Sequence, residues 1–343
     1  MELNCPVPIS RYNKVVLGHG GGGKLSGDLI EGLMIKELGN DMLNVLHDGA
    51  IFESAGKLAF STDSFVVNPI FFPGGDIGEL AVYGTVNDIS CCGATPLYLS
   101  LSLIIEEGLP MDDLRKIIVS VRNAAKISGV KIITGDTKVV EKGKGDKIFI
   151  NTSGVGSVIS GVTVSPDSCK PGDMILLNGY IGDHGIAIIS SREGIQFETT
   201  VVSDCAPLNT LVADICNICP SVRVFRDPTR GGVASALNEI SKASGYGIRI
   251  FEREIPVRDE VRGACEILGF DPLYVANEGK LIVIVPGEDA DRVLEVMKKN
   301  PGGGDSAIIG EVTGDKTGVR METVIGSSRI VDMISGEQLP RIC

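Results

Sequence analysis

The chain has no tryptophan and only three histidines among its 343 residues. So few histidines argue against a transition-metal centre built mainly from imidazole ligands. No stretch approaches the roughly 20 consecutive apolar residues that a membrane-crossing helix needs. The first residues also lack the basic segment and apolar run of a secretory signal. We therefore expect a cytoplasmic protein with no membrane partner.

Positive charge is also scarce, because 32 Lys and Arg face 44 Asp and Glu for a net charge of −12. A protein that binds nucleic acid over a broad surface needs a basic footprint, so we expect no nucleic-acid partner. Nine cysteines in a chain of this length indicate reduced thiols rather than a disulfide framework. The 44 glycines indicate tight turns and close approach of the backbone to a ligand.

Hydrophobic periodicity and turn residues predict helices that alternate with strands. The expected helices span residues 25–38, 78–92, 110–129, 230–244 and 289–299. The expected strands span 57–63, 130–134, 147–153, 174–178 and 280–285, with acidic turns at 135–136 and 182–185. The pattern begins again after the turn-forming residues 165–173, so we expect two layered α/β domains.

The first candidate site is a glycine run, composed of His19, Gly20, Gly21, Gly22, Gly23 and Lys24. Consecutive glycines expose backbone N–H groups just before an expected helix, which suits a phosphate. The spacing is not that of a Walker A loop. A flexible linker at a domain edge is the alternative, and the glycines alone do not decide between the two.

The second candidate is a set of aspartates at the ends of apolar elements: Asp63, Asp88, Asp136 and Asp227. Mg²⁺ prefers hard oxygen ligands and uses one or two carboxylates together with substrate phosphates. Each aspartate alone also fits a helix cap or a turn. The polar neighbours of the aspartates favour a function, since they include Asn87, Thr137 and Arg230.

Lys138 and Glu278 flank apolar strands and form a candidate acid–base or charge-neutralising pair, with two solvated charges as the alternative. The Cys216 and Cys219 pair has no second pair of ligands, so buried packing is favoured over zinc. Cys91 and Cys92 are likewise interpreted as packing residues.

Cys343 is the final residue, and residues 335–343 are too short and broken to form an element, so we expect a mobile tail. A thiol on such a tail is an accessible nucleophile, although a cysteine there can also be incidental. Extended at about 3.3–3.6 Å per residue, residues 337–343 span roughly 23–25 Å, enough to carry the thiol into a cleft.

Taken together, these motifs resemble the HypE family of hydrogenase maturation factors. That family lies in the superfamily of aminoimidazole ribonucleotide (AIR) synthetase, thiamine-monophosphate kinase and selenophosphate synthetase. The resemblance runs nearly end to end, through residues 19–23, 60–64, 71–75, 84–88, 106–111, 134–140, 182–185, 227–232, 276–280 and 340–343. The aspartate clusters are typical of the superfamily, whereas the terminal Pro340-Arg341-Ile342-Cys343 is specific to the family.

The resemblance implies a mixed α/β fold of two PurM-like domains and a homodimer formed through the first domain. The implied segments are an N-terminal extension with the glycine-rich loop (1–45), an ATP-binding and dimerisation domain (46–165), a C-terminal domain (166–334) and a flexible tail (335–343). It also implies Mg²⁺ on Asp63, Asp88 and Asp136. ATP would be bound by residues 19–24 together with Asn87, Thr137, Asp227 and Arg230.

The implied activity is ATP-dependent dehydration of a carbamoyl group on Cys343 to a thiocyanate, through an iminophosphate. HypF would donate the carbamoyl group, and the HypC–HypD complex would accept cyanide for the iron of nickel–iron hydrogenase. Glu278 would act as the base and Lys138 would neutralise charge. Two alternatives are another kinase or ligase of the superfamily that acts on a small molecule, and a non-catalytic carrier.

Overall fold

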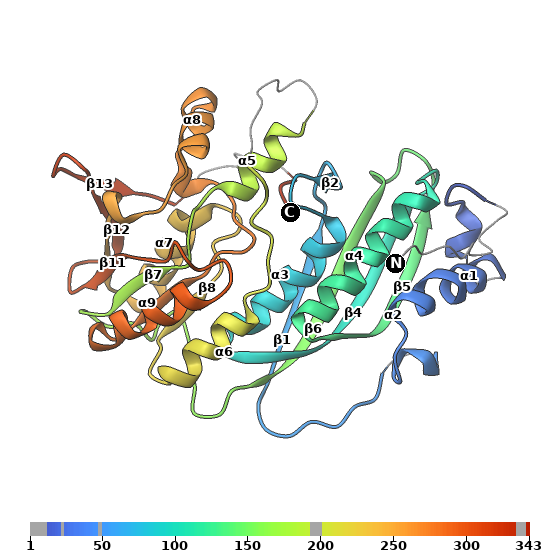
Figure 1. Cartoon of the computed structure of the whole chain (residues 1–343), viewed down its shortest axis with the longest axis horizontal. Helices are drawn as coiled ribbons and strands as arrows, with labels where there is room; N and C mark the ends of the chain where they lie inside the picture. Colours follow the sequence, from blue (N-terminus) through green and yellow to red (C-terminus); the bar gives the residue numbers. More distant parts are fainter. Residues whose placement is uncertain (1–11, 22–23, 47–49, 193–200, 334–340) are drawn as a thin grey trace.

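The computed structural model describes residues 12–21, 24–46, 50–192, 201–333 and 341–343. Two sheets lie side by side, each with helices packed on it (Figure 1). The mixed α/β class expected from the sequence is confirmed. No helix in these ranges is long and apolar enough to cross a membrane.

The first sheet has four strands in the order β1-β6-β4-β5. Their bounds are Leu58–Phe65 for β1, Ile148–Val158 for β6, Ala94–Glu106 for β4 and Lys131–Val140 for β5. Two helices, α3 (Ile77–Cys91) and α4 (Met111–Ser128), cover one face. The sequence predicted α4 well because Pro110 precedes its first turn and Gly129, with φ of +71°, caps its end. The short strands β2 (Phe71–Phe72) and β3 (Gly75–Asp76) form a hairpin before α3.

No helix of the described residues covers the outer face of the first sheet (Figure 1). Side chains alternate along a strand, so Leu101 and Leu103 of β4 point into the core while Ile104 points outward and is 46% exposed. Phe60 on β1 is 68% exposed on that same outer face. This bare sheet face carries large apolar side chains.

The N-terminal segment wraps the edge of the first sheet. Its elements are η1 (Leu17–Gly20), α1 (Lys24–Leu29), the π-helical turn η2 (Ile30–Ile35), α2 (Lys36–Leu38) and η3 (Leu43–Val45). Val15 is fully buried and exchanges backbone hydrogen bonds with Gly108 and Leu109. The predicted helix of residues 25–38 is therefore present, with a π-helical middle.

The second sheet has seven strands in the order β13-β12-β9-β11-β7-β10-β8. The strands are β7 (Met174–Leu177), β8 (Val224–Arg226), β9 (Gly247–Phe251), β10 (Ile282–Val285), β11 (Ala307–Thr313), β12 (Gly318–Glu322) and β13 (Ser328–Val331). The helices are α5 (Asp183–Ser190), α6 (Asn209–Ile218), α7 (Gly232–Ser244), α8 (Asp259–Leu268) and α9 (Ala290–Lys299), with short turns η4 (Glu252–Glu254), η5 (Pro272–Tyr274) and η6 (Gly287–Asp289). All four residues of β10 are buried because α7 covers one face and α6 and α9 cover the other.

Three expectations about local structure were wrong. The pair Gly135 and Asp136 lies inside β5, because β4 pairs with this strand as far as Val140. Residues 182–185 are the start of α5 rather than a turn. Cys92 is exposed at the end of α3 and is not a packing residue. Cys216 and Cys219, by contrast, are buried in an apolar cluster as predicted.

Candidate active site around the C-terminal cysteine

The last three residues of the chain lie against the segment that follows β1. The N–H of Val66 donates to a terminal carboxylate oxygen of Cys343 at 3.0 Å, and the N–H of Asn68 donates to the carbonyl oxygen of Arg341 at 3.2 Å. Ile342 and Cys343 are buried, with 2% and 8% of their surface exposed. This differs from the loose tail expected from the sequence, although residues 335–340 lie outside the described residues.

Side chains from both halves of the protein hold this terminus. His184 on α5 contacts the carbonyl oxygen of Ile342 through Nε2 at 2.8 Å. Arg192 donates through Nη2 to the carbonyl oxygen of Arg341 at 3.0 Å and through Nε to that of Asn68 at 3.0 Å. The guanidinium of Arg341 pairs with Asp146. The terminus is therefore seated by specific contacts and not by apolar burial alone.

The thiol of Cys343 lies among charged groups. Burial raises its pKa to about 12, and the negative charges of Glu278 and Asp63 act in the same direction. Arg230 opposes this rise through its charge and a hydrogen bond with the thiol. In the seated position the thiol is therefore protonated at neutral pH and is a poor nucleophile.

We expect Cys343 to react with iodoacetamide more slowly than Cys92, which is exposed on α3, at about pH 7.5. The seated terminus retains the thiol proton more tightly than a free tail, whose thiol has a pKa near the ordinary 9.0. The difference in thiol pKa therefore favours seating in full below about pH 9, and this contribution is lost as the pH rises toward about 12, so labelling of Cys343 should increase steeply in that window. Cleavage after Glu337 releases residues 338–343 for mass spectrometry. Equal labelling of both thiols near neutral pH would contradict the seated terminus.

Glu278 is buried next to this thiol, just before β10, with 4% of its surface exposed. Its N–H donates to Oδ1 of Asp204 at 3.1 Å, and its carbonyl oxygen accepts from Nδ2 of Asn87 at 3.1 Å. Its Oε1 atom has no hydrogen-bond partner among the described residues. Burial raises the pKa of Glu278 well above its usual range, and the nearby carboxylates of Asp204 and Asp227 add to the rise. Once ionised, such a carboxylate is a strong base.

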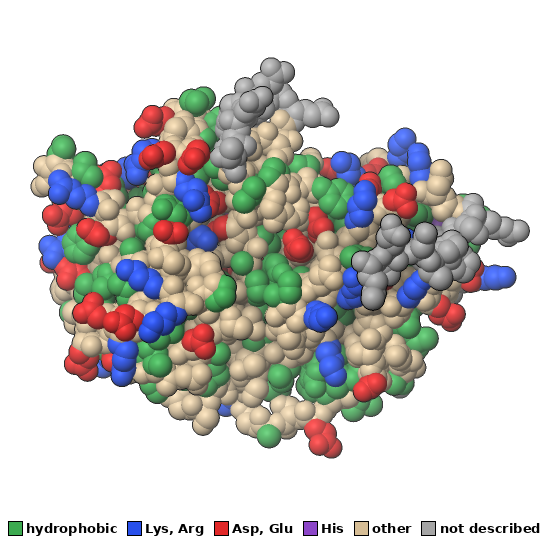
Figure 2. Space-filling view, in the orientation of Figure 1, with side chains coloured by type: hydrophobic (Ala, Val, Ile, Leu, Met, Phe, Trp, Pro, Cys, Tyr) green, Lys and Arg blue, Asp and Glu red, His purple; other side chains and the backbone are tan. Residues whose placement is uncertain are grey.

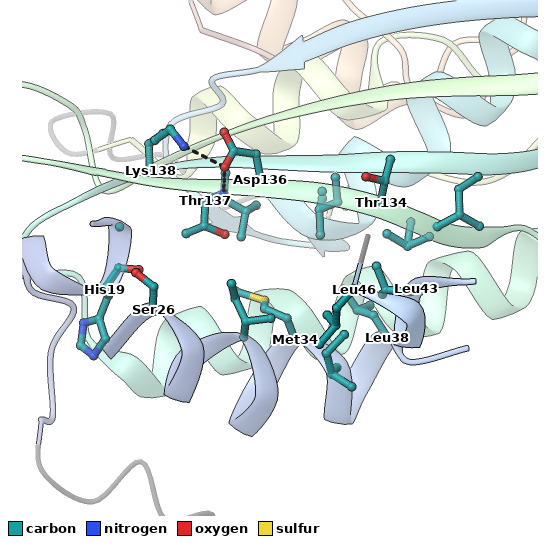
Figure 3. Close-up of a pocket in the computed structure, with 18 of the residues that line it drawn as sticks. His19, Ser26, Met34, Leu38, Leu43, Leu46, Thr134, Asp136, Thr137 and Lys138 are labelled. Carbon is teal, nitrogen blue, oxygen red and sulfur yellow. Dashed lines mark hydrogen bonds and ion pairs between the residues drawn. The ribbon is translucent and has the colours of Figure 1, made fainter. Parts of the chain in front are cut away.

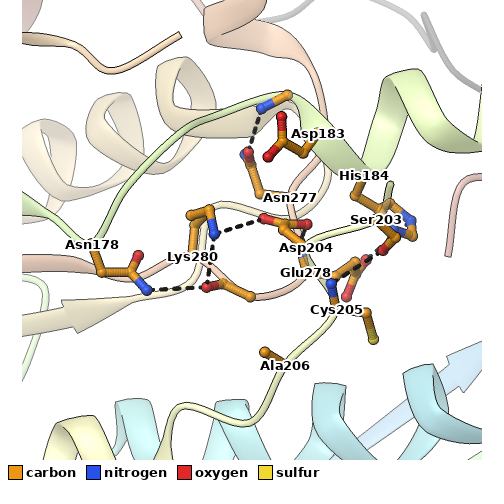
Figure 4. A network of polar contacts seen from close by, with 12 residues as sticks. Asn178, Asp183, His184, Ser203, Asp204, Cys205, Ala206, Asn277, Glu278 and Lys280 are labelled. Carbon is orange, nitrogen blue, oxygen red and sulfur yellow. Dashed lines mark hydrogen bonds and ion pairs between the residues drawn. The ribbon is translucent and has the colours of Figure 1, made fainter. Parts of the chain in front are cut away.

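Sequence reasoning missed the polar network that fixes this loop (Figure 4). Lys280 pairs with Asp204 at 3.4 Å, and Nδ2 of Asn178 donates to the carbonyl oxygen of Gly279 at 3.1 Å. A Cβ on Gly279 would lie 1.9 Å from the carbonyl oxygen of Asp204, so only glycine allows the two segments to approach this closely. The signal for Lys280 was present in the sequence motif of residues 276–280, but Asp204 lies outside every motif.

Three of the four predicted aspartates come together between the two sheets. Ser61 donates to Oδ2 of Asp88 at 2.7 Å, and Asp63 faces α3 from the same side of β1. Burial and the charge of Asp88 raise the pKa of Asp227 to about 7, and burial together with the charge of Asp63 raises the pKa of Asp88. Mutual repulsion of this kind is relieved by a cation.

These aspartates fit Mg²⁺ only together with a ligand that supplies further oxygens. Within the described ranges no three His, Cys, Asp or Glu side chains converge closely enough to hold a metal ion on their own. Mg²⁺ commonly uses one or two carboxylates and completes its shell with phosphate oxygens and water. Asp63 and Asp88 have the right chemistry for that arrangement.

Asp136 and Lys138 are separated from the other site residues. They lie on β5, with β4 and β6 between them and β1, so their backbone is about 14 Å from that of Asp63 at about 4.8 Å per strand. Register places Asp136 in one row with Asn151 and Ser64, on the bare sheet face, whereas Asp63 faces α3. The expected set of Asp63, Asp88 and Asp136 is therefore not assembled within one chain. Asp136 and Lys138 instead pair with each other at 2.9 Å.

A pocket of about 270 Å³ lies between β5 and the N-terminal helices (Figure 3). Leu38, Leu43 and Leu46 line one end together with Thr134, and Ser26 and Thr137 lie at the other end (Figure 3). The ring of His19 does not face it, since Nδ1 accepts from the N–H of Val16 at 3.0 Å. The pocket combines an apolar end with a polar end, and Gly20 also lines it, which suits a nucleoside with attached phosphates. Gly22 and Gly23 lie outside the described residues, and Lys24 is exposed.

The pocket predicts that alanine substitution at two neighbouring glycines changes the affinity for ATP to different extents. A Cβ on Gly20 would lie 2.3 Å from the backbone nitrogen of Val139, whereas one on Gly21 would meet its nearest neighbour at 3.8 Å. Gly20→Ala must displace the loop at a cost of about 1–3 kcal/mol. We expect its affinity for ATP to fall about tenfold, while Gly21→Ala binds normally. Calorimetry with both variants checks this, and equal affinities would remove the loop from the nucleotide site.

Asn87 connects the two halves of the protein. Its Nδ2 donates to the carbonyl oxygens of Ala206 and Glu278, both at 3.1 Å, and its Oδ1 accepts from the N–H of Leu208 at 2.8 Å. These bonds engage its polar atoms, and the residue is buried. The structure therefore places Asn87 as a support for the Glu278 loop rather than as a free ligand for the nucleotide.

Comparison with known proteins finds similarity over nearly the whole chain. The chain matches the family models for the N-terminal domain of AIR synthase related proteins over residues 46–158 and for the C-terminal domain over residues 170–322. It is 53% identical to the carbamoyl dehydratase HypE of Azotobacter vinelandii over 335 residues, which cover 97% of this chain and 98% of that protein.

Two solved structures extend the similarity to three dimensions. One is a hydrogenase maturation protein HypE in complex with ATP, with a TM-score of 0.93 and 48% identity over 96% of this chain and 99% of that one. The other is a HypE–HypF complex, with a TM-score of 0.80 and 51% identity over 89% of this chain and 99% of that one. The chain belongs to the HypE family of carbamoyl dehydratases.

Proposed function

We propose that this chain uses ATP to remove water from a carbamoyl group carried on Cys343, leaving a thiocyanate for transfer of cyanide to the iron of nickel–iron hydrogenase. The observation that carries the proposal is the burial of the Cys343 thiol beside Glu278, whose Oε1 has no hydrogen-bond partner in the described chain. A group attached to that sulfur lies next to an unsatisfied carboxylate. Relatives named carbamoyl dehydratase and a relative solved with ATP support this assignment.

The reaction needs ATP because an amide oxygen is a poor leaving group. Transfer of the γ-phosphoryl group to the carbamoyl oxygen breaks the bond to the β-phosphate and releases ADP, and it forms an iminophosphate, R–S–C(OPO₃²⁻)=NH, with loss of one N–H proton. The C–O bond then breaks, phosphate leaves with the bonding electrons, and the remaining N–H proton is removed as the C≡N bond forms. Phosphoryl transfer of this kind depends on positioning and charge neutralisation. Mg²⁺ on Asp63 and Asp88 would supply neutralisation of the phosphate charge.

Glu278 is the proposed base for the N–H protons. Its raised pKa makes the ionised carboxylate a good proton acceptor. Because Oε1 has no hydrogen-bond partner among the described residues, a bond to the N–H group of an entering carbamoyl group is favoured. Arg230, which hydrogen-bonds the thiol, would balance the negative charge that develops on the phosphate oxygen as the C–O bond breaks. Asp227 supports the metal side of the site.

A homodimer is the second part of the proposal. The outer face of the first sheet carries exposed Phe60 and Ile104, and monomeric proteins seldom leave such apolar faces open. Asp136 and Lys138 lie on the same face. Pairing of two such faces about a twofold axis would bury Asp136 and Lys138 in the interface, and we propose that they reach the partner chain's active site around the edge of its sheet that β1 forms.

The C-terminal residues must leave their seated position for Cys343 to receive the carbamoyl group and later to donate cyanide. A HypE–HypF complex among the similar structures supports HypF as the carbamoyl donor, and the HypC–HypD complex is the proposed cyanide acceptor. A thiol with a pKa near 12 in the seated position is not a useful nucleophile, so carbamoylation takes place on the released tail.

Incubation of the carbamoylated protein with Mg-ATP tests the proposal. The peptide of residues 338–343 should lose the mass of one water, and Cys343→Ala should not show this loss. A small-molecule kinase or ligase would consume ATP without changing the peptide, and a non-catalytic carrier would consume none. Water loss without ATP, or on another cysteine, would overturn the mechanism.

A further inference from the structure

We propose that His184 is a positioning residue that holds the seated terminus by the carbonyl oxygen of Ile342 and thereby leaves Oε1 of Glu278 free to accept a proton. The role of Glu278 in this inference rests on the proposed function, whereas the seating of the terminus does not. His184 lies at the start of α5 and is fully buried.

The hydrogen bonds around His184 fix the position of its proton. Nε2 lies 2.8 Å from the carbonyl oxygen of Ile342, and a carbonyl oxygen only accepts, so Nε2 carries the hydrogen. Nδ1 lies 2.8 Å from Oγ of Ser203, which also accepts from the N–H of Cys205 at 3.1 Å. Ser203 therefore donates its hydroxyl proton to Nδ1. Burial lowers the pKa of His184, which keeps the ring neutral.

The same nitrogen faces the proposed base. Nε2 of His184 lies 4.0 Å from Oε1 of Glu278, the atom that lacks a hydrogen-bond partner in the described part of the chain. A shift of about 1 Å would bring the two atoms within hydrogen-bonding distance. When the terminus is seated, the Nε2–H group of His184 donates to the carbonyl oxygen of Ile342 and therefore does not donate to Glu278.

Release of the terminus removes that acceptor. The N–H group of His184 then turns to Oε1 of Glu278, because a buried donor and a buried acceptor without partners are both costly. A hydrogen bond to the ionised carboxylate stabilises it and weakens it as a base. Seating of the terminus thus delivers the Cys343 adduct and frees the base in one movement. Phe72 packs edge-on against the imidazole at 5.6 Å between ring centres, which limits the ring to this small motion.

The first test uses ¹⁵N nuclear magnetic resonance of the imidazoles, in which the three histidines of the chain give few signals and His184→Gln identifies the one of interest. The full-length wild type should show a neutral His184 with hydrogen on Nε2. Arg341→Glu, which places a carboxylate beside Asp146 and so releases the terminus, should move the Nε2–H proton resonance downfield as Glu278 becomes the acceptor. Hydrogen on Nδ1 in the wild type, or an unchanged resonance after release, would overturn the inference.

The second test compares two substitutions of His184. A glutamine amide places its N–H near the position of Nε2, whereas asparagine is too short to do so. His184→Gln should keep Cys343 protected from iodoacetamide within about threefold of wild type and retain most of the ATP-dependent water loss. His184→Asn should label at least about tenfold faster, equivalent to a loss of about 1.4 kcal/mol of seating free energy. Equal behaviour of the two variants would overturn the positioning role.

Two measurements keep this comparison interpretable. Ser190→Ala on the same helix, where Oγ donates to the carbonyl oxygen of Ala187 within α5, should match wild type. Thermal melting and ATP affinity show whether the buried substitutions preserve the fold. Imidazole resonances and thiol labelling need neither ATP nor a carbamoyl group, so a failed dehydratase assay with normal labelling would count against the proposed function and not against the seating by His184.

Discussion

Glu278→Gln is expected to slow the ATP-dependent loss of water from carbamoylated Cys343 by about 10²–10⁴-fold, the range typical for removal of a general base. The amide has nearly the same shape as the carboxylate and cannot accept a proton in the reaction. The backbone contacts of Glu278 to Asp204 and Asn87 do not involve its side chain, so the loop should remain in place. ATP binding should therefore be unchanged.

The slower loss of water must result from the absence of this carboxylate and not from the loss of one negative charge on the protein. Glu260→Gln provides the matched control, because Glu260 lies exposed on α8 in the second half of the chain. Single-turnover mass spectrometry of the peptide of residues 338–343 gives the rate. A Glu278→Gln protein that loses water within about threefold of the wild-type rate would remove Glu278 as the base.

Local signals were sufficient to predict several elements of the fold. Helix α4 has Pro110 at its start, acidic residues in its first turn and Gly129 at its end, and the structure places it within one residue of the prediction. Strand β10 was predicted as a short apolar run, and burial on both faces explains why it has no polar alternation. These features depend on neighbours within a few positions in the chain.

Other features depend on pairing between distant segments. The sequence reasoning ended the strand before Gly135, because glycine and aspartate usually mark turns. Pairing with β4 instead carries β5 to Val140, and the two-residue period then turns Asp136 away from Asp63. Three aspartates were expected in one metal site, but only strand order and register determine which of them share a face.

Sequence patterns also could not predict which residues contact Cys343 and the residues next to it. Glu278 and Arg230 were proposed from their motifs, and both lie beside the thiol. His184 was part of a motif without an assigned role, and Asp204 lay outside every motif. His184 contacts Ile342 only because α5 packs against the last residues of the chain, and Asp204 contacts Glu278 only because the loop before α6 packs against the loop before β10. Composition and spacing carry no information on such contacts.

A mixture of two inactive variants is expected to regain about one quarter of wild-type activity. The variants are Asp136→Asn and Glu278→Gln, co-expressed or denatured and refolded together. Random pairing makes half of the molecules heterodimers. If each site combines Asp136 of one chain with Glu278 of the other, every heterodimer holds one site with both native residues and one site with neither, so about one quarter of all sites are intact.

The separation of β5 from β1 is the reason to expect this outcome. Asp136 and Glu278 cannot meet within one chain while Asp136 lies on the outer face of the sheet and Glu278 lies on the side of α3. If both residues instead served the same chain, each site of a heterodimer would lack one of them and the mixture would stay inactive. Asp63→Asn mixed with Glu278→Gln is the matched comparison, because the charge of Asp63 raises the pKa of Glu278 within one chain. That mixture should show no recovery of activity. One chain supplies both Asp63 and Glu278 to a site, so each site of a heterodimer lacks one of the two residues. Recovery in the first mixture alone requires a dimer whose active sites are shared across the twofold axis.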